Sequence, residues 1–326
     1  MKLTERVEYE FKPMDMGNVM HEALESFAEE VRKRGMKWTE LTEQERNEIA
    51  DRCLDNIVAD YGNTVLKSSA RNEYMIERTR RILRRTVWAL QKQLEQGEFQ
   101  PEGFEVTFGG GRIDRVDIME DQNKVYVKVI DYKTGNTSFD LVYLYHGLQL
   151  QLMIYLDGAL RVEQKKYPDK EIILREFLLQ YQDPMIQEKI DADVEAVSAG
   201  LMKELKMNGL VQADPELVYR MDSSLGSIPV AFNKDGSFRK NSSVADRTQF
   251  AVLGRYVRMK IEKIRSSILE GDAEVSPYEL GKKNACTYCP YMTVCGFDRR
   301  LSGYEFRRLK NFSDEELWKA FDREAE

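Results

Sequence analysis

Two β-rich runs joined by a short polar turn constrain the fold of this chain more than any other feature. Residues 111–119 and 124–132 are rich in β-branched and apolar residues, and turn-forming residues lie between them. This pattern predicts a β-hairpin. If the turn lies at residues 122–123, Asp114 on the first strand directly faces Asp131 on the second.

The facing carboxylates allow two interpretations. Directly opposed side chains have Cβ atoms about 4.5–5.5 Å apart, so two carboxylates there repel each other. A divalent cation removes the conflict, since Mg²⁺ takes oxygen ligands at about 2.1 Å. Lys133 shares a face with Asp131, because strand side chains alternate, and it is a candidate catalytic lysine. The alternative is an ordinary salt-bridged strand, in which the arginines beside Asp114 neutralise it and the strand ends in a charged turn.

Helical patterns surround the hairpin. Residues 15–35 predict a helix capped by Asp15 and ended by Gly35. Its core stripe is Met20, Leu24, Phe27 and Val31. Further helices are expected at about residues 43–60, 70–96, 139–161, 186–207 and 247–270, and a strand at about residues 172–181.

The region before the last long helix is polar and loop-rich over residues 208–242, with a hairpin signal at Asp235-Gly236. Ser243 and Asp246 predict a capping box for the helix, which Gly271 ends. The expected stripe of that helix is Phe250, Leu253, Val257, Ile261, Ile264 and Ile268. We expect an α/β fold with a mixed β-sheet flanked by helices, as one domain over residues 1–275 with a cysteine-rich tail over residues 276–326.

Composition and charge narrow the class of protein. The chain has 326 residues, of which 42% are hydrophobic and 32% charged, as in soluble globular proteins. No apolar run approaches the ~20 residues of a membrane span, and the N-terminal residues lack the apolar region of a secretory signal, so we expect a cytoplasmic protein with no membrane partner. The net charge of −7 lowers the expectation of nonspecific nucleic-acid coating. The arginine clusters at residues 78–85 and 307–310 fit either solvated helix faces or DNA contacts.

Three of the four cysteines form one cluster. Cys286, Cys289 and Cys295 are spaced C-x2-C-x5-C, which favours metal or iron–sulfur ligation over a disulfide framework. Cys53 lies at helical spacing with Ile49 and Ile57, which predicts a buried core residue.

Two further features have both a functional and a structural interpretation. Gln151 and Tyr155 are four residues apart on a predicted helix, so their polar ends either face a substrate phosphate or are satisfied inside the core. His21 lies on the flank of the first helix, where a lone histidine is more often structural than a ligand. The chain contains no G-x-x-x-x-G-K-[ST] loop, so we do not expect it to hydrolyse ATP itself.

Several segments, taken in order, resemble the motifs of the RecB-like branch of the PD-(D/E)XK nuclease superfamily, which implies a restriction-endonuclease-like core. These are "GNVMHEALE", "GRIDRVD", "VIDYKTG" and "QLQLMIY". The later segments "DSSLGSIPVAFNKDGSF" and "YELGKKNACTYCPYMTVCGFD", together with "RRLK", resemble the C-terminal nuclease domain found in AddAB-type ATP-dependent helicase–deoxyribonucleases, on their B-type chain. The resemblance covers about residues 5–320.

The resemblance implies roles for the matching residues. His21, Asp114, Asp131 and the backbone carbonyl of Tyr132 would hold Mg²⁺ or Mn²⁺, with Lys133 as the catalytic lysine. Gln151 and Tyr155 would orient the DNA strand. Cys286, Cys289 and Cys295 would be three ligands of a [4Fe–4S] cluster, which we expect to be labile or absent because the family's first cluster cysteine, upstream of the first helix, has no match here.

The implied activity is a metal-dependent DNA exonuclease that acts on the 5′-ended strand in recombination and double-strand-break repair, with DNA and an A-type helicase–nuclease subunit as partners. A nuclease of CRISPR adaptation is a second interpretation, against which the long middle region argues. A catalytically idle DNA-end clamp is a third, against which the complete Asp114, Asp131 and Lys133 set argues.

Overall fold

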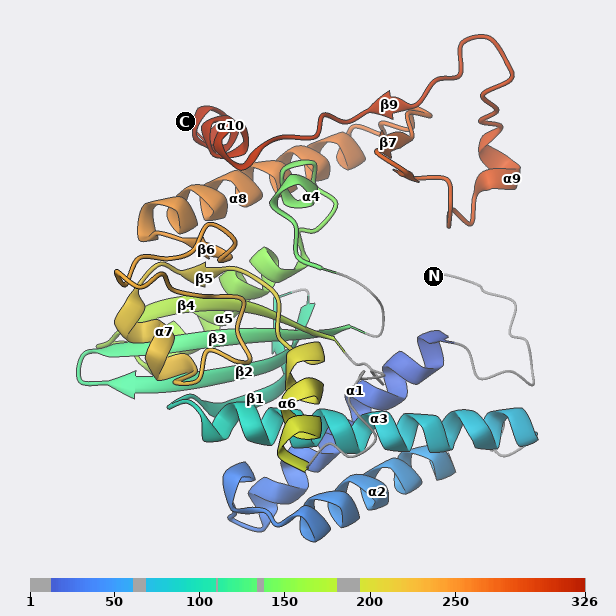
Figure 1. Cartoon of the computed structure of the whole chain (residues 1–326). Helices are drawn as coiled ribbons and strands as arrows, with labels where there is room; N and C mark the ends of the chain where they lie inside the picture. Colours follow the sequence, from blue (N-terminus) through green and yellow to red (C-terminus); the bar gives the residue numbers. More distant parts are fainter. Residues whose placement is uncertain (1–12, 61–68, 110, 134–137, 181–193, 326) are drawn as a thin grey trace. The chain divides into compact units, whose positions relative to one another are not determined.

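The computed structural model of the chain describes residues 13–60, 69–109, 111–133, 138–180 and 194–325 (Figure 1). It forms two compact units. The first comprises residues 1–139 and 154–246, and the second comprises residues 140–153 and 247–326. The boundary expected between residues 275 and 276 stays a prediction. Among the helices that the structure describes, none combines the length and hydropathy that a transmembrane segment requires.

The first unit opens with a group of helices that pack against one another. They are α1 (Pro13–Lys33), the 3-10 helix η1 (Trp38–Glu40), α2 (Glu43–Asp60) and α3 (Ala70–Glu95). The predicted stripe of α1 is confirmed, since Met20, Leu24, Phe27 and Val31 are all buried. The predicted cap is wrong, because α1 begins at Pro13 and Asp15 lies inside its first turn. Gly35 follows the helix with a φ of 66°, a conformation that glycine adopts without strain.

A four-stranded mixed sheet follows these helices within the same unit (Figure 1). Its strands are β1 (Gln100–Phe108), β2 (Gly111–Asp121), β3 (Lys124–Lys133) and β4 (Glu171–Gln180), in the order β1-β2-β3-β4. The first three pair antiparallel, and β4 pairs parallel with β3. Arg115 pairs with Ile130 and Asp121 with Lys124, so the predicted hairpin register is confirmed.

The return from β3 to β4 passes through two helices rather than the single helix expected over residues 139–161. They are α4 (Leu141–Tyr145), capped by Asp140, and α5 (Gln151–Lys166). The prediction failed because apolar periodicity runs through the break, whereas Gly147 adopts a φ of 78° that no helix continues.

Smaller elements complete the first unit. They are α6 (Val194–Glu204), β5 (Val211–Gln212), α7 (Pro215–Met221) and β6 (Val244–Ala245). Residues 186–193 of the expected helix lie outside the described residues. The expectation of a loop over residues 208–242 missed α7, which Asp214 caps and which has proline in its first turn. The hairpin at Asp235-Gly236 is confirmed, because Phe232 pairs with Phe238 and Gly236 has a φ of 83°.

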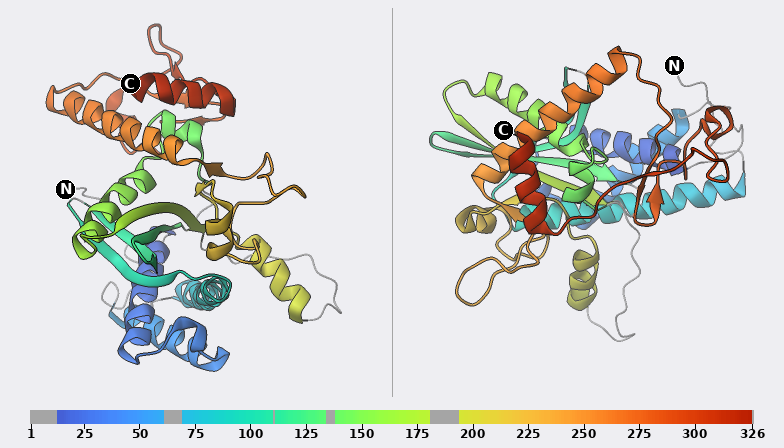
Figure 2. Two further views of the ribbon diagram at one scale, coloured as in Figure 1. Left: turned by 90° about the vertical axis from the view of Figure 1, so that its left-hand side faces the viewer. Right: turned by 90° about the horizontal axis from the view of Figure 1, so that it is seen from above.

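The second unit is built on the long helix α8 (Arg247–Leu269), against which α10 (Asp314–Ala325) packs (Figure 2). Between them lie β7 (Tyr278–Leu280), β8 (Lys283–Asn284), α9 (Met292–Cys295) and β9 (Arg307–Arg308). The predicted capping box is wrong, because Ser243 donates its hydroxyl hydrogen bond to the carbonyl of Gly209 and precedes β6.

The predicted stripe of α8 is only partly correct. Leu253 and Val257 are buried, but the side chains toward the end of the helix are not. Ile264 is 42% exposed and Ile268 is 70% exposed. Helical spacing predicts which face is apolar, but it does not show how far along the helix that face is covered.

Candidate active site

Asp114 and Asp131 lie on adjacent strands, one position beyond the paired residues Arg115 and Ile130. Both carboxylates are buried, with 6% and 1% of the residue exposed. Asp114 Oδ2 accepts a hydrogen bond of 2.7 Å from the backbone N–H of Tyr132. The Nζ of Lys133 lies 2.8 Å from Asp131 Oδ2. The hairpin thus brings two carboxylates and an ammonium together at the end of β3.

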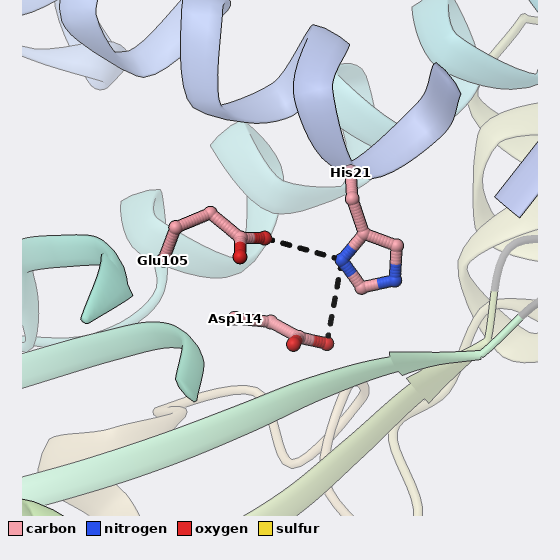
Figure 3. Close-up of side chains that lie close together, drawn as sticks. All are labelled: His21, Glu105 and Asp114. Carbon is pink, nitrogen blue, oxygen red and sulfur yellow. Dashed lines mark hydrogen bonds and ion pairs between the residues drawn. The ribbon is translucent and has the colours of Figure 1, made fainter. Parts of the chain in front are cut away.

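His21 of α1 joins the carboxylates of the sheet (Figure 3). Its Nδ1 lies 3.3 Å from Glu105 Oε1 and 3.6 Å from Asp114 Oδ2. One potential ligand atom from each of these side chains lies within 4.8 Å of the others. The long-range packing of α1 therefore places the histidine beside the carboxylates.

Glu105 is the residue that the sequence interpretation missed. In β1, Phe104 pairs with Arg115 and Val106 with Ile113, so Glu105 falls opposite Asp114. Its φ of 49° is a left-handed value that is rare for a residue with a side chain. Such backbone strain is concentrated at functional sites, where surrounding contacts hold it in place.

These residues line a pocket of about 550 Å³ within the first unit. Its lining residues are Asn18, His21, Glu22, Glu25, Glu105, Arg112, Asp114 and Tyr155. Acidic side chains outnumber the basic ones, and Arg112 is already engaged, with its Nε 2.6 Å from Glu105 Oε2. The pocket therefore suits a cation better than an anion.

The acidic groups share protons in the absence of a cation. Burial and the charge of Asp131 raise the pKa of Asp114 to about 7. Burial also raises the pKa of Asp131, although the neighbouring Lys133 opposes it. Burial lowers the pKa of His21, but the hydrogen bond to Glu105 and the charge of Asp114 outweigh it and raise this pKa above its ordinary value. Carboxyl groups that hold protons this tightly fit a site that a divalent cation completes.

Comparison with known proteins decides the family. A family model described as the PD-(D/E)XK nuclease superfamily matches residues 1–296. The chain belongs to this superfamily. Its mixed sheet and the paired Asp114 and Asp131 are thus those of a PD-(D/E)XK nuclease domain, and divalent metals are the cations that such nucleases generally use.

Similar curated proteins share one name, the B-type chain of an ATP-dependent helicase/deoxyribonuclease. The protein of Lachnoclostridium phytofermentans is 39% identical over 350 residues, which covers 100% of this chain and 30% of that protein. That of Clostridium acetobutylicum is 34% identical and covers 99% of this chain and 30% of its own length. That of Thermoanaerobacter sp. is 32% identical with the same 30% share. The nuclease domain therefore spans about a third of the curated relatives that it matches.

Tyr155 and Gln151 of the nuclease domain both lie on α5. Tyr155 lines the pocket, and its ring meets Phe108 edge-on at a centroid distance of 6.0 Å. A side chain at Gly158 would clash, because a Cβ there would lie 2.6 Å from the Phe108 ring. Gln151 begins α5, in the part of the helix that belongs to the second unit, and its role stays a prediction.

The arginines at residues 78–85 are largely engaged with acidic side chains of the nuclease domain. Arg80 pairs with Asp55 and Glu77, and Arg84 pairs with Asp51. These contacts favour the structural interpretation of that cluster. Arg307 and Arg308 of the other cluster are exposed on β9, and DNA contact there stays a prediction.

The cysteines of the nuclease domain fall into two settings. Cys53 is 4% exposed within the core of the first unit, as predicted. Cys286, Cys289 and Cys295 lie together in the second unit and are partly exposed. Partial burial and the nearby Cys289 and Cys295 thiols raise the pKa of Cys286, so the three sulfurs are neighbours. They offer three thiols to a shared ligand.

Proposed function

We propose that this nuclease domain hydrolyses DNA phosphodiester bonds with Mg²⁺ or Mn²⁺ held by His21, Asp114, Asp131 and the backbone carbonyl of Tyr132. The placement of Asp114 and Asp131 on adjacent strands, with Lys133 beside Asp131, is the observation that carries the proposal. Glu105 joins the set, because its carboxylate approaches the same histidine. Carboxylate oxygens and an imidazole nitrogen are suitable donors for these cations.

The residues of the site divide the work of the reaction. A bound divalent cation would stabilise charge on the phosphate oxygens and make water a stronger nucleophile. Lys133 keeps an ammonium at the edge of the carboxylate pair, where it offsets the negative charge that builds up on the phosphate in the transition state. Tyr155, on the pocket wall, and Gln151 orient the DNA strand.

The names of the relatives support a place for the domain in a larger helicase–deoxyribonuclease. We infer that it acts in the cytoplasm with an A-type helicase–nuclease partner, on the 5′-ended strand, during recombination and double-strand-break repair. The match to these relatives over the whole chain favours this assignment over a nuclease of CRISPR adaptation.

End-labelled linear duplex DNA tests the function. We expect label to be released with Mg²⁺ and retained with EDTA, and the 5′-ended strand to shorten first. Cleavage that EDTA does not affect would contradict the metal mechanism. DNA binding with no cleavage under any divalent cation would favour the end clamp instead.

The cysteine cluster leads to a separate expectation. A [4Fe–4S] cluster normally takes four thiolates, and Cys286, Cys289 and Cys295 supply three while Cys53 is buried in another core. We expect protein purified anaerobically to be colourless and to contain far less than about four irons per chain. Iron and acid-labile sulfide analysis measures this. A nearly full complement that is lost on Cys53→Ser would show that Cys53 is the fourth ligand.

A further inference from the structure

A single buried guanidinium lies behind the candidate active site. Strand side chains alternate, so the residues next to the acidic ligands point to the opposite face of the sheet. These neighbours are Phe104 beside Glu105, Arg115 beside Asp114 and Tyr132 beside Asp131. All three meet at the side chain of Arg115.

The contacts of Arg115 hold it on every side. Its guanidinium carbon lies 5.3 Å from the centroid of the Trp38 ring and 5.5 Å from that of Phe104. The rings of Trp38 and Phe104 are themselves parallel, with centroids 5.8 Å apart. The Nε and Nη2 of Arg115 donate to the two carboxylate oxygens of Asp117, the second at 2.9 Å. The phenol of Tyr132 lies within electrostatic reach of the same guanidinium.

This ionic group is expensive to bury. Arg115 is 1% exposed and Asp117 is 0% exposed, and Lys128 adds a third buried charge with its Nζ 2.8 Å from Asp117 Oδ2. Buried ion pairs return little net stability compared with apolar residues of the same volume. A role in fixing geometry accounts better for charges at this position than a role in stability.

We infer that Arg115 is a positioning residue, which holds the strand segments bearing Glu105, Asp114 and Asp131 in place from the opposite face and so sets the affinity of the site for its cation. The inference rests on the proposed metal-dependent function. Arg115 touches neither the substrate nor the reacting atoms. It acts through Phe104, through its own backbone and through Tyr132, whose N–H donates to Asp114.

Mn²⁺ binding, followed by electron paramagnetic resonance on folded protein, separates this role from general stability. We expect Arg115→Met to weaken Mn²⁺ binding by about tenfold or more, as loss of a residue that orients metal ligands typically does. Arg115→Lys should weaken binding less, because it keeps the charge but not the flat, forked contact with Asp117 and the rings.

Lys128→Met is the matched control. It removes a charge from the same buried group, but Lys128 lies next to Val127 and Val129, which belong to no ligand set. We expect it to lower the melting temperature while leaving the dissociation constant for Mn²⁺ within about twofold of the original.

Several outcomes would overturn the inference. Folded Arg115→Met that binds Mn²⁺ as tightly as the original chain contradicts it, and so does an equal loss in Lys128→Met. If Arg115→Met does not fold, Tyr132→Phe removes only the phenol at Arg115. That variant should weaken Mn²⁺ binding more than Lys128→Met does, and unchanged binding would contradict the inference. An original chain that binds no Mn²⁺ would instead contradict the proposed function.

Discussion

Replacing Asp131 by alanine is expected to abolish Mg²⁺-dependent DNA hydrolysis while the chain stays folded. Asp131 is 1% exposed, shares its surroundings with Asp114 and contacts Lys133, so its loss removes a metal ligand and frees the lysine. We expect the single-turnover cleavage rate to fall by at least about a hundredfold. The melting temperature in EDTA should hold or rise, because removing one of two adjacent carboxylates relieves repulsion.

Asp121→Ala is the control for this experiment. Asp121 lies at the turn end of the same hairpin, where it pairs with Arg220 at 2.8 Å, away from Asp114 and Asp131 along the strands. Its replacement should leave the cleavage rate nearly unchanged. Undiminished cleavage by Asp131→Ala, after separation from contaminating nucleases, would count decisively against the proposed mechanism.

The second large effect concerns stability in the absence of a cation. The pKa of Asp114 rises from an ordinary 3.8 to about 7 in the folded chain. Between these values the folded state keeps a proton that the unfolded chain has released, so stability falls as pH increases through this window. The raised pKa of His21 acts in the same direction, because its favourable charge is lost as pH increases further.

Asp114→Asn removes the carboxyl group that opposes folding at high pH. In EDTA at pH 8 we expect it to raise the free energy of unfolding by roughly 2–4 kcal/mol, the equivalent of two to three pKa units. The gain should disappear near pH 4, where Asp114 is protonated in both states. Urea unfolding at the two pH values measures this, and Mg²⁺ should stabilise the original chain more than the variant. Equal stabilities in EDTA at pH 8 would show that Asp114 is not under strain.

The hairpin could be predicted because local patterns determine it. The turn residues fix the register of β2 and β3, and that register alone places Asp114 opposite Asp131. The contact of His21 with Asp114 depends on how α1 packs, which no local spacing shows. The family resemblance supplied that expectation instead.

Glu105 shows where the local reasoning stopped too early. The glycines after Phe108 make a tight turn, and the register that follows places Glu105 opposite Asp114. The same counting used for the next hairpin would have found it. The strained φ of Glu105 and its contact with His21 could not be predicted, since both depend on tertiary packing.

Errors in the helices arose from features that periodicity does not register. Apolar spacing continues across Gly147, but the positive φ of that glycine separates α4 from α5. Ser243 has the spacing of a cap, but Gly209, distant in sequence, accepts its hydroxyl hydrogen bond. Backbone conformation at the first place and a tertiary hydrogen bond at the second therefore override the local signals.

Crystals of the protein soaked in Mn²⁺ give the most direct test of the proposed site, because anomalous scattering locates the ion without reference to activity. We predict one strong peak within about 2.5 Å of carboxylate oxygens of both Asp114 and Asp131, and close to His21. The absence of a peak there at saturating Mn²⁺, in protein that cleaves DNA, would contradict the assignment of this site as the nuclease centre.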